Sequence, residues 1–263
     1  MTFRLLFIGD VVGEAGCAAV LTHVPVLRRE LELDAVVVNG ENSAPGGRGI
    51  TPESGSDLLS VADFLTLGNH TFDAEGGKEY VGREPRVIRP ANLENGSAGR
   101  GWGKFETGGV RVGVANVQGR VFMRQGVRSP FEAADRAVAD LEAAGADLIL
   151  MDVHAEATSE KQALGYHLAG RAQIVVGTHT HVPTADTRIL SGGTAYVSDV
   201  GMTGGKDSVI GFDKDDFLGL FLGEKRPRVG VAKGPAVLNA VIVDVDVESR
   251  RASVIERVYR EHA

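Results

Sequence analysis

The sequence has little of what membrane-spanning, disulfide-bonded or secreted proteins need. Its 263 residues contain one cysteine, Cys17, which excludes an internal disulfide and a thiolate metal cluster and suits a reducing compartment. No apolar run approaches the roughly 18 to 20 residues of a membrane span, and the first ten residues have neither the length nor the cleavage site of a signal peptide. We therefore expect a cytoplasmic protein in which nitrogen and oxygen ligands hold any metal.

Positive charge is also scarce. The chain has 28 Lys and Arg against 35 Asp and Glu, a formal net charge of −7. Binding long nucleic acid by phosphate neutralisation requires a basic stripe, so that class of partner is excluded, as is a membrane. A small phosphoester or nucleotide is still a possible substrate if its site is locally positive, and a homo-oligomer is also possible.

The hydrophobic pattern predicts one domain over residues 1–263. Short β-branched or leucine-rich runs alternate with helical patterns, which is typical of a layered α/β fold. Strands are expected at 3–9, 35–39, 64–67, 110–117, 147–153 and 172–177, with helices at 14–31, 51–62 and 129–144. Beyond residue 182 the pattern predicts strands without helices, at 194–200, 237–247 and 252–261. The expected fold is an α/β layered sandwich of two mixed β-sheets flanked by helices.

Five of the expected strands are followed by side chains that commonly bind metals. These side chains are Asp10, then Glu41 with Asn42, then Asn69 with His70, then His154, and finally His179 with His181. Taken singly, each has a simpler explanation as a turn residue, a helix N-cap, a loop residue or a buried histidine. The carboxyl ends of parallel strands share one edge, where open α/β sheets bind their ligands. The five coincidences together favour a metal site.

The chemistry of this set suits two divalent metal ions. Imidazole, carboxylate and carboxamide ligands favour Fe or Mn, with Zn possible, over Mg²⁺, which accepts imidazole poorly. Two such ions, two carboxylates and a bridging hydroxide leave a net charge of about +1 at the site. An acidic protein can therefore still bind a phosphate ester there.

In this order, the motifs resemble those of the calcineurin-like metallophosphoesterases, and most closely their bacterial YmdB-type branch. The blocks that carry the resemblance, between Phe3 and about Phe212, are GDVVG, NGENSA, LGNHTFD, DVHAEATSEK, VGTHTHVPTAD and DVGMTG. The resemblance implies a metallophosphoesterase-like fold and a dinuclear metal-dependent phosphoesterase. It implies phosphodiesterase activity on small cyclic nucleotides, such as 2′,3′-cAMP, through attack by a hydroxide that bridges the metals.

Three positions depart from the pattern of the wider family. Val12 stands where that family has the histidine of DxH, Glu41 replaces an aspartate, and Thr178 displaces the first histidine of GHxH. Asn42 is the candidate for the ligand place that Val12 leaves open, as in the YmdB-type branch. A carboxamide is a weaker ligand than an imidazole, so the first metal site is expected to be looser or to select a different ion.

The resemblance also implies how the ligands are divided. One ion would be held by Asp10, Asn42 and His181, the other by Asn69, His154 and His179, with Glu41 bridging both. In an extended segment the side chains at positions i and i+2 point the same way, so the histidines of THTH could reach neighbouring ions. His70 is then the candidate general acid for the leaving group.

Some alternatives stay open. The loop from Ser43 to Gly49 carries Arg48, which could contact the phosphate of a substrate or belong to a solvated loop. The enzyme could instead be a phosphomonoesterase, such as a nucleotidase or phosphatase. The chain could also be a regulatory binding protein with a structural metal site.

Overall fold

The computed structural model describes residues 1–93, 97–123, 126–224 and 229–263. Its first sheet contains seven strands: β1 (Thr2–Ile8), β2 (Ala35–Asn39), β3 (Phe64–Thr66), β4 (Val87–Ile88), β11 (Gly204–Gly205), β12 (Ala236–Asp246) and β13 (Arg251–His262). The second sheet contains six: β5 (Trp102–Thr107), β6 (Val110–Gln118), β7 (Leu148–His154), β8 (Ile174–Thr178), β9 (Arg188–Leu190) and β10 (Thr194–Val197). The helices are α1 (Gly13–Glu30), α2 (Pro52–Leu59), α3 (Gly77–Arg83), α4 (Pro130–Ala143), α5 (Thr158–Leu168) and α6 (Lys214–Phe221).

Both sheets are mixed. In the first, β1, β2, β3 and β4 are parallel neighbours, and β12 pairs antiparallel with β1 on one side and with β13 on the other. In the second, β6, β7, β8 and β10 are parallel, and β5 and β9 pair antiparallel at its two edges. The parallel strands of each sheet therefore end at one edge.

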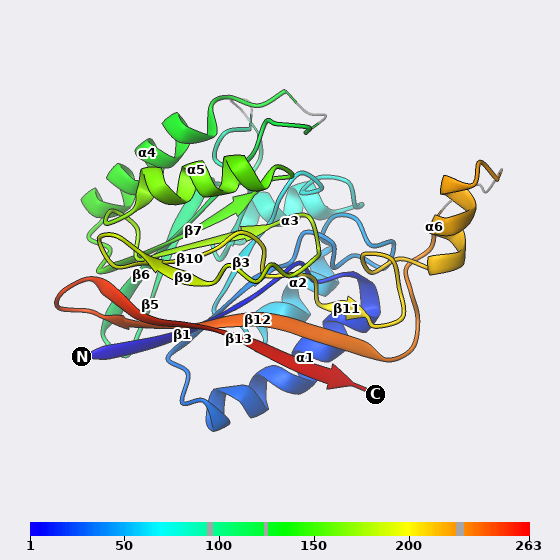
Figure 1. Cartoon of the computed structure of the whole chain (residues 1–263), viewed down its shortest axis with the longest axis horizontal. Coiled ribbons are helices and arrows are strands. Elements are labelled where there is room, and N and C mark those ends of the chain that lie inside the picture. The colour runs from blue at the N-terminus through cyan, green and yellow to red at the C-terminus, as the bar shows by residue number, and fades with distance from the viewer. Residues whose placement is uncertain (94–96, 124–125, 225–228) are drawn as a thin grey trace.

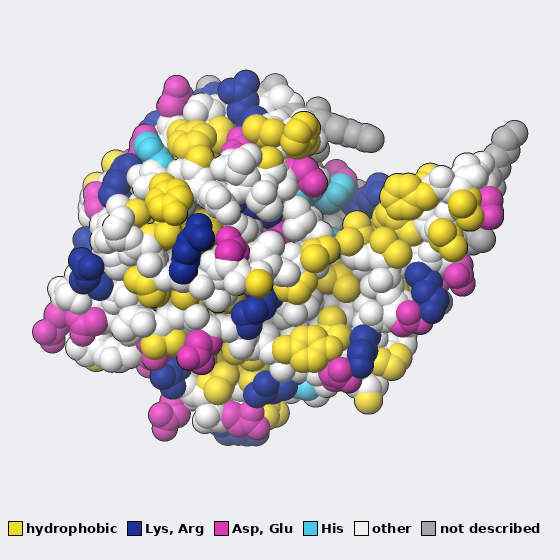
Figure 2. All heavy atoms as spheres, in the orientation of Figure 1, with side chains coloured by type: hydrophobic (Ala, Val, Ile, Leu, Met, Phe, Trp, Pro, Cys, Tyr) yellow, Lys and Arg dark blue, Asp and Glu magenta, His cyan; other side chains and the backbone are white. Residues whose placement is uncertain are grey.

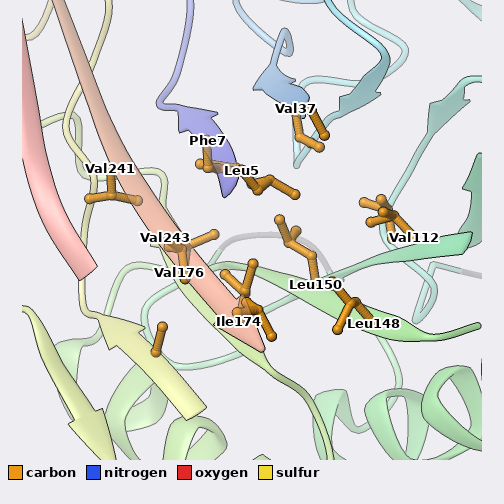
Figure 3. Packing of buried hydrophobic residues seen from close by; sticks show 14 of the residues in the cluster. Leu5, Phe7, Val37, Val112, Leu148, Leu150, Ile174, Val176, Val241 and Val243 are labelled. Atoms are coloured by element: carbon orange, nitrogen blue, oxygen red, sulfur yellow. The ribbon is translucent and has the colours of Figure 1, made fainter. Parts of the chain in front are cut away.

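The two sheets pack face to face around an aliphatic core. Alternate residues of β1 point to opposite faces, so Leu5 and Phe7 lie between the sheets whereas Leu6 and Ile8 face the helices. Figure 3 shows side chains of the first sheet directed toward those of the second, such as Leu150. Each fully buried side chain of this size stabilises the fold by roughly 1.5–3 kcal/mol.

Helices cover the outer face of each sheet. Residues of α1 and α2 pack with the first sheet and residues of α4 and α5 with the second, which gives four layers (Figure 1). The starts of α2 and α4 follow from local chemistry: Thr51 and Ser129 accept a hydrogen bond from the third helical residue, and each is followed by proline. The predicted α/β sandwich of two mixed sheets is confirmed.

Several local predictions were wrong. Helix α6 lies in the region where only strands were expected, and it projects from the body of the molecule (Figures 1 and 2). Asp213 caps it, but Gly219 is its one buried residue and Phe217 is its one side chain packed against a buried cluster, so it displays no continuous apolar stripe in the sequence. The pattern also missed β5 and α3. No helix among the described residues has both the length and the apolarity needed to cross a membrane.

Candidate metal centre

The side chains that the sequence singled out come from both sheets. Asp10, Glu41, Asn42, Asn69 and His70 follow strands of the first sheet, and His154, His179 and His181 end or follow strands of the second. A single sheet edge was expected, but the site lies where the carboxyl ends of two sheets converge. Figure 2 shows the surface hollowed between the upper lobe and the α6 arm, with histidine and acidic side chains at the base of the hollow.

Four ligand-type side chains meet at the Nε2 atom of His154. This atom lies 3.0 Å from Glu41 Oε1, 2.9 Å from Asn69 Oδ1 and 3.1 Å from His179 Nδ1. The ligand atoms of Glu41, His154 and His179 all lie within 4.8 Å of one another. His154 is completely buried and Glu41 nearly so, so solvent offers them little compensation.

A buried relay fixes the tautomer of His154. Its Nδ1 lies 2.9 Å from the hydroxyl of Thr178, which donates a hydrogen bond of 2.7 Å to Asp152. Asp152 also accepts hydrogen bonds from Thr66 and Asn39. Because the Thr178 proton is committed to Asp152, Thr178 accepts from Nδ1–H, so Nε2 is the ring atom that would bind a metal ion in place of its proton.

The other two histidines are oriented in the same manner. His179 Nε2 lies 3.2 Å from the Glu156 carboxylate, which accepts its proton and leaves Nδ1 as the ligating atom. His181 Nδ1 lies 2.7 Å from the carbonyl oxygen of Ile210, and its Nε2 points toward Asp10, at 4.0 Å from Oδ1. Each imidazole thus presents a lone pair to the centre.

Two buried oxygen atoms of the centre also keep free lone pairs. Glu41 Oε1 and Asn42 Oδ1 accept no hydrogen bond from the described residues. The amide nitrogen of Asn42 donates to Gly47 O at 2.8 Å, which leaves Oδ1 directed elsewhere. Buried acceptors are normally paired, so this donor set fits a divalent cation that binds nitrogen and oxygen.

The charges at the centre lead to the same conclusion. Burial alone would raise the pKa of Glu41, but the neighbouring His154 outweighs it and lowers that pKa to about 2. Burial would lower the pKa of His154, and Glu41 together with Asp10 raises it to about 9. Burial raises the pKa of Asp10 to about 6, and burial together with His154 lowers that of His179 to about 3. The carboxylates therefore require a positive charge, which a metal ion can supply in place of a proton.

The backbone of THTH is not extended. His179 has φ of +97° and His181 has φ of +65°, so both lie in the left-handed region, which costs a non-glycine residue about 1–3 kcal/mol. Thr180 between them points away, because its backbone N–H and its hydroxyl both donate to Asp199. The expected explanation for the HxH spacing, an extended segment, is therefore wrong: the turn directs both rings.

A buried ion pair supports this turn. Lys161 on α5 donates to Asp199 at 2.7 Å, and both side chains are fully buried. Asp199 also accepts hydrogen bonds from Thr180 and from the backbone N–H of Gly201. The histidine pair is thus tied to the helix that follows β7.

The glycine of GNH is required by close packing. A Cβ atom at Gly68 would lie 2.3 Å from both Glu41 Oε2 and His154 Nε2. The same Glu41 oxygen accepts a hydrogen bond of 3.0 Å from the backbone N–H of His70. The strand end and the carboxylate therefore hold each other in place.

His70 lies beside the centre and not within its group of converging atoms. Its Nδ1 is 2.7 Å from Asp73 Oδ2, and its side chain is 26% exposed. His70 lines a cavity of about 310 Å³ together with Asn69, Asp73, Gln118, Phe122, Met123 and His179. The ring can therefore meet a molecule that binds in this cavity.

Sequence reasoning missed the residues that orient the ligands. Asp73 stands three residues after His70, which is a spacing that could have signalled it, and Glu156 was interpreted as favouring a helix start. Asp152 and Asp199 reach their hydrogen-bond partners only when distant segments pack together. No local sequence spacing therefore indicates that they orient the ligands. Arg48 is exposed, and no hydrogen bond or ion pair joins its side chain to the described residues.

The comparison with known proteins agrees with this geometry. The chain is 43% identical to the 2′,3′-cyclic-nucleotide 2′-phosphodiesterase of Bacillus subtilis (strain 168), over 97% of this chain and 96% of that one. A Mycoplasma pneumoniae structure described as a novel phosphatase superposes with a TM-score of 0.92 at 32% identity, covering 100% of this chain and 94% of that one. A hypothetical protein from Thermus thermophilus gives a TM-score of 0.91 at 41% identity, covering 99% and 100%. The predicted relationship is confirmed: the profile of the YmdB-like protein family matches residues 6–258, and the chain belongs to that family.

Proposed function

We propose that this phosphoesterase is a dinuclear metal-dependent phosphodiesterase that hydrolyses small cyclic nucleotides such as 2′,3′-cAMP. One observation carries the proposal: the lone pairs of Glu41, His154 and His179 converge beside a cavity onto which His70 opens. The cyclic diester comes from the name of the Bacillus subtilis relative, which is 43% identical.

The proposed ligands are the carboxylate, carboxamide and imidazole side chains that follow or end the five strands. They are Asp10, Glu41, Asn42, Asn69, His154, His179 and His181. Two divalent ions, Fe or Mn before Zn, suit this mixture of imidazole, carboxylate and carboxamide. When bound, such ions activate water for attack on phosphorus and neutralise charge that develops on the phosphoryl oxygens.

His70 would protonate the leaving ribose oxygen. Asp73 accepts the proton of Nδ1 and so fixes the ring, which leaves Nε2 to hold the transferable proton. Glu41 holds the backbone N–H of His70 at 3.0 Å, so the acid is positioned by the same carboxylate that serves the metals. This coupling supports a catalytic centre over a purely structural metal site, which needs no adjacent acid.

A phosphomonoesterase is the second candidate, because the Mycoplasma pneumoniae relative is described as a phosphatase. Initial rates on bis(p-nitrophenyl) phosphate, p-nitrophenyl phosphate and 2′,3′-cAMP with Mn²⁺ separate the two. We expect the diesters to be preferred, and a strong preference for the monoester would overturn the proposal. Protein that carries no metal and hydrolyses no ester with Mn²⁺, Fe²⁺ or Zn²⁺ would instead be a regulatory binding protein.

The remaining parts of the proposal concern Arg48 and the compartment. Arg48 is exposed on the loop that Asn42 holds through Gly47, so a substrate in the hollow could recruit its exposed guanidinium. Exchange of Arg48 for Met should raise KM for a phosphodiester without changing metal content. With one cysteine and no disulfide, the chain suits a reducing compartment, and we propose a cytoplasmic location.

A further inference from the structure

The side chain of Gln118 is buried beside the candidate metal centre and has no hydrogen-bond partner among the described residues. Its backbone is held on both sides by Asn92, which accepts from Gln118 N at 2.8 Å and donates to Gln118 O at 2.6 Å. The carboxamide oxygen and nitrogen, in contrast, make no hydrogen bond to any described residue, although the residue is 0% exposed. An amide with both ends unpaired destabilises the free protein, so a bound molecule that pairs with it gains affinity.

A second unusual side chain lies on the same cavity. Phe122 is 85% exposed, and its φ of +62° places a bulky aromatic residue in the left-handed region. Such strain persists only where the surroundings impose it, and it is concentrated at functional sites. An aromatic ring held in water at the mouth of a polar cavity offers an open face for stacking.

Hydrogen bonds attach the loop that carries Phe122 to helix α5 and to the end of strand β7. Glu160 on α5 is nearly buried and accepts hydrogen bonds from the backbone N–H groups of Arg120 and Val121, between 3.0 and 3.1 Å. Gly119 N donates to His154 O at 2.9 Å. The loop is therefore fixed to the end of β7, which also carries a candidate ligand.

We propose that Phe122 and Gln118 form a nucleoside subsite, in which the base stacks on Phe122 and the Gln118 carboxamide hydrogen-bonds the ribose. The inference rests on the proposed phosphodiesterase function and names what binds beyond the phosphorus. The shared cavity supports it, because Gln118, His179 and His70 line the same cavity as the exposed Phe122. A carboxamide both donates and accepts, which suits hydroxyl and ring oxygens of a sugar.

Three cyclic diesters test the two contacts separately. 2′,3′-cAMP has base and ribose, 1-O-methylribose 2,3-cyclic phosphate lacks the base, and glycerol 1,2-cyclic phosphate lacks both. Phe122→Ala should lower kcat/KM for 2′,3′-cAMP relative to the methylriboside by about 5- to 150-fold, mainly through KM, since that is the range for one base stacked on an aromatic ring. Phe122→Trp should retain the preference. Tyr166→Ala, which removes another exposed aromatic ring, is the matched control and should change neither rate.

Gln118→Met removes both polar groups at similar size. It should lower kcat/KM for the two ribose-bearing substrates relative to the glycerol diester by about 10-fold. The melting temperature should stay the same or rise, because an unpaired buried amide is lost. A structural amide would behave in the opposite way, with a lower melting temperature and no change in substrate preference.

Other outcomes would reject the subsite. Equal loss on all three diesters after Phe122→Ala would make Phe122 a structural residue, and no loss on any would remove its role. A wild-type enzyme that hydrolyses all three diesters equally well would keep the phosphodiesterase proposal and overturn the subsite. Failure of the wild-type enzyme on all three, with Mn²⁺ bound, would instead overturn the phosphodiesterase proposal itself.

Discussion

In each imidazole ring of the centre, one nitrogen contacts a group that orients the ring and the other faces the candidate metal site. His154 uses Thr178, His179 uses Glu156 and His181 uses the carbonyl of Ile210. In each ring the nitrogen that faces the centre is the one that would bind a metal ion. The sequence identified these three histidines as candidates, but it did not reveal which nitrogen of each would face inward, because their partners come from other segments.

Removal of the His70 ring should separate proton transfer from metal binding. His70→Ala should lower kcat on 2′,3′-cAMP by about 10²- to 10⁴-fold, the usual contribution of a general acid. The loss should be much smaller on bis(p-nitrophenyl) phosphate, whose leaving group needs no proton. Elemental analysis should find the same metal content as in the wild type.

The partner of His70 provides a graded control. Asp73→Asn keeps the shape of the side chain but removes the charge that fixes the ring at 2.7 Å, so it should reduce turnover less than His70→Ala. If His70→Ala loses metal together with activity, His70 is a ligand and the assignment of the general acid is wrong.

The two histidines of THTH should differ in the ion that they serve. His181→Ala should chiefly weaken the ion near Asp10, where Val12 stands in place of a histidine. His179→Ala should chiefly weaken the ion near His154. Titration of each variant with Mn²⁺, followed by isothermal calorimetry, should show one weakened site. Equal loss of both sites from either variant would contradict the division.

Among the structural elements, the turn after β8 is where the structure differs most clearly from the predicted extended segment. The sequence placed His179 and His181 after a buried strand, and that placement is confirmed by β8. Their positive φ values could not be predicted from the sequence, because the turn is held by Asp199, which lies 19 residues after Thr180. Asp199 is in turn paired with Lys161 in helix α5. Tertiary contacts override the local preference of the backbone.

Replacing Lys161 with an uncharged residue should loosen the turn that carries His179 and His181. Lys161→Met leaves Asp199 buried without its charged partner, so we expect the free energy of unfolding to fall by about 3–5 kcal/mol. Chemical denaturation measures this change, and metal content measured alongside should also fall, because the turn carries two candidate ligands.

The double variant tests whether the charge is the cause. Lys161→Met combined with Asp199→Asn removes both charges and should be less destabilised than the sum of the single variants. Strict additivity of the two losses would show that Lys161 acts through packing and not through the ion pair.

Among the other elements, α6 and β5 could not be predicted from hydrophobic periodicity. β5 is an edge strand with mostly exposed or half-buried side chains, and α6 buries one residue. Elements that bury little do not display the apolar spacing on which sequence reasoning depends. The central strands, buried on both faces, were predicted within a few residues.

For the whole molecule, the candidate centre joins two sheets. Glu41 and Asn69 follow strands of the first sheet, whereas His154 ends and His179 follows a strand of the second, and their atoms meet within about 3 Å. Metal ions at this point would connect the two sheets at the carboxyl ends of their parallel strands.

Removal of metal should therefore destabilise the entire fold. An ion at 100 times its dissociation constant adds about 2.7 kcal/mol to the free energy of unfolding when it binds only the folded chain. Prolonged dialysis against a chelator should lower the melting temperature, and Mn²⁺ should restore it. Glu41→Gln, which loses the charge shared by the centre, should melt at a temperature that neither treatment changes. A wild-type melting temperature that is indifferent to chelation would argue against ions that bridge the sheets.

The layered α/β fold, the central strands, the family and the side chains able to bind metals could all be predicted from the sequence. These features depend on local hydrophobic periodicity and on which residue follows each strand, both of which the chain displays directly. The tertiary structure decided that two sheets, and not one, supply the centre. It also decided which ring nitrogens face inward and that Gln118 and Phe122 share the cavity of His70. Those features depend on distances between segments that are far apart in the sequence, 24 residues for His154 and Thr178 and 85 residues for His154 and Asn69. Only packing of the two sheets brings such segments together.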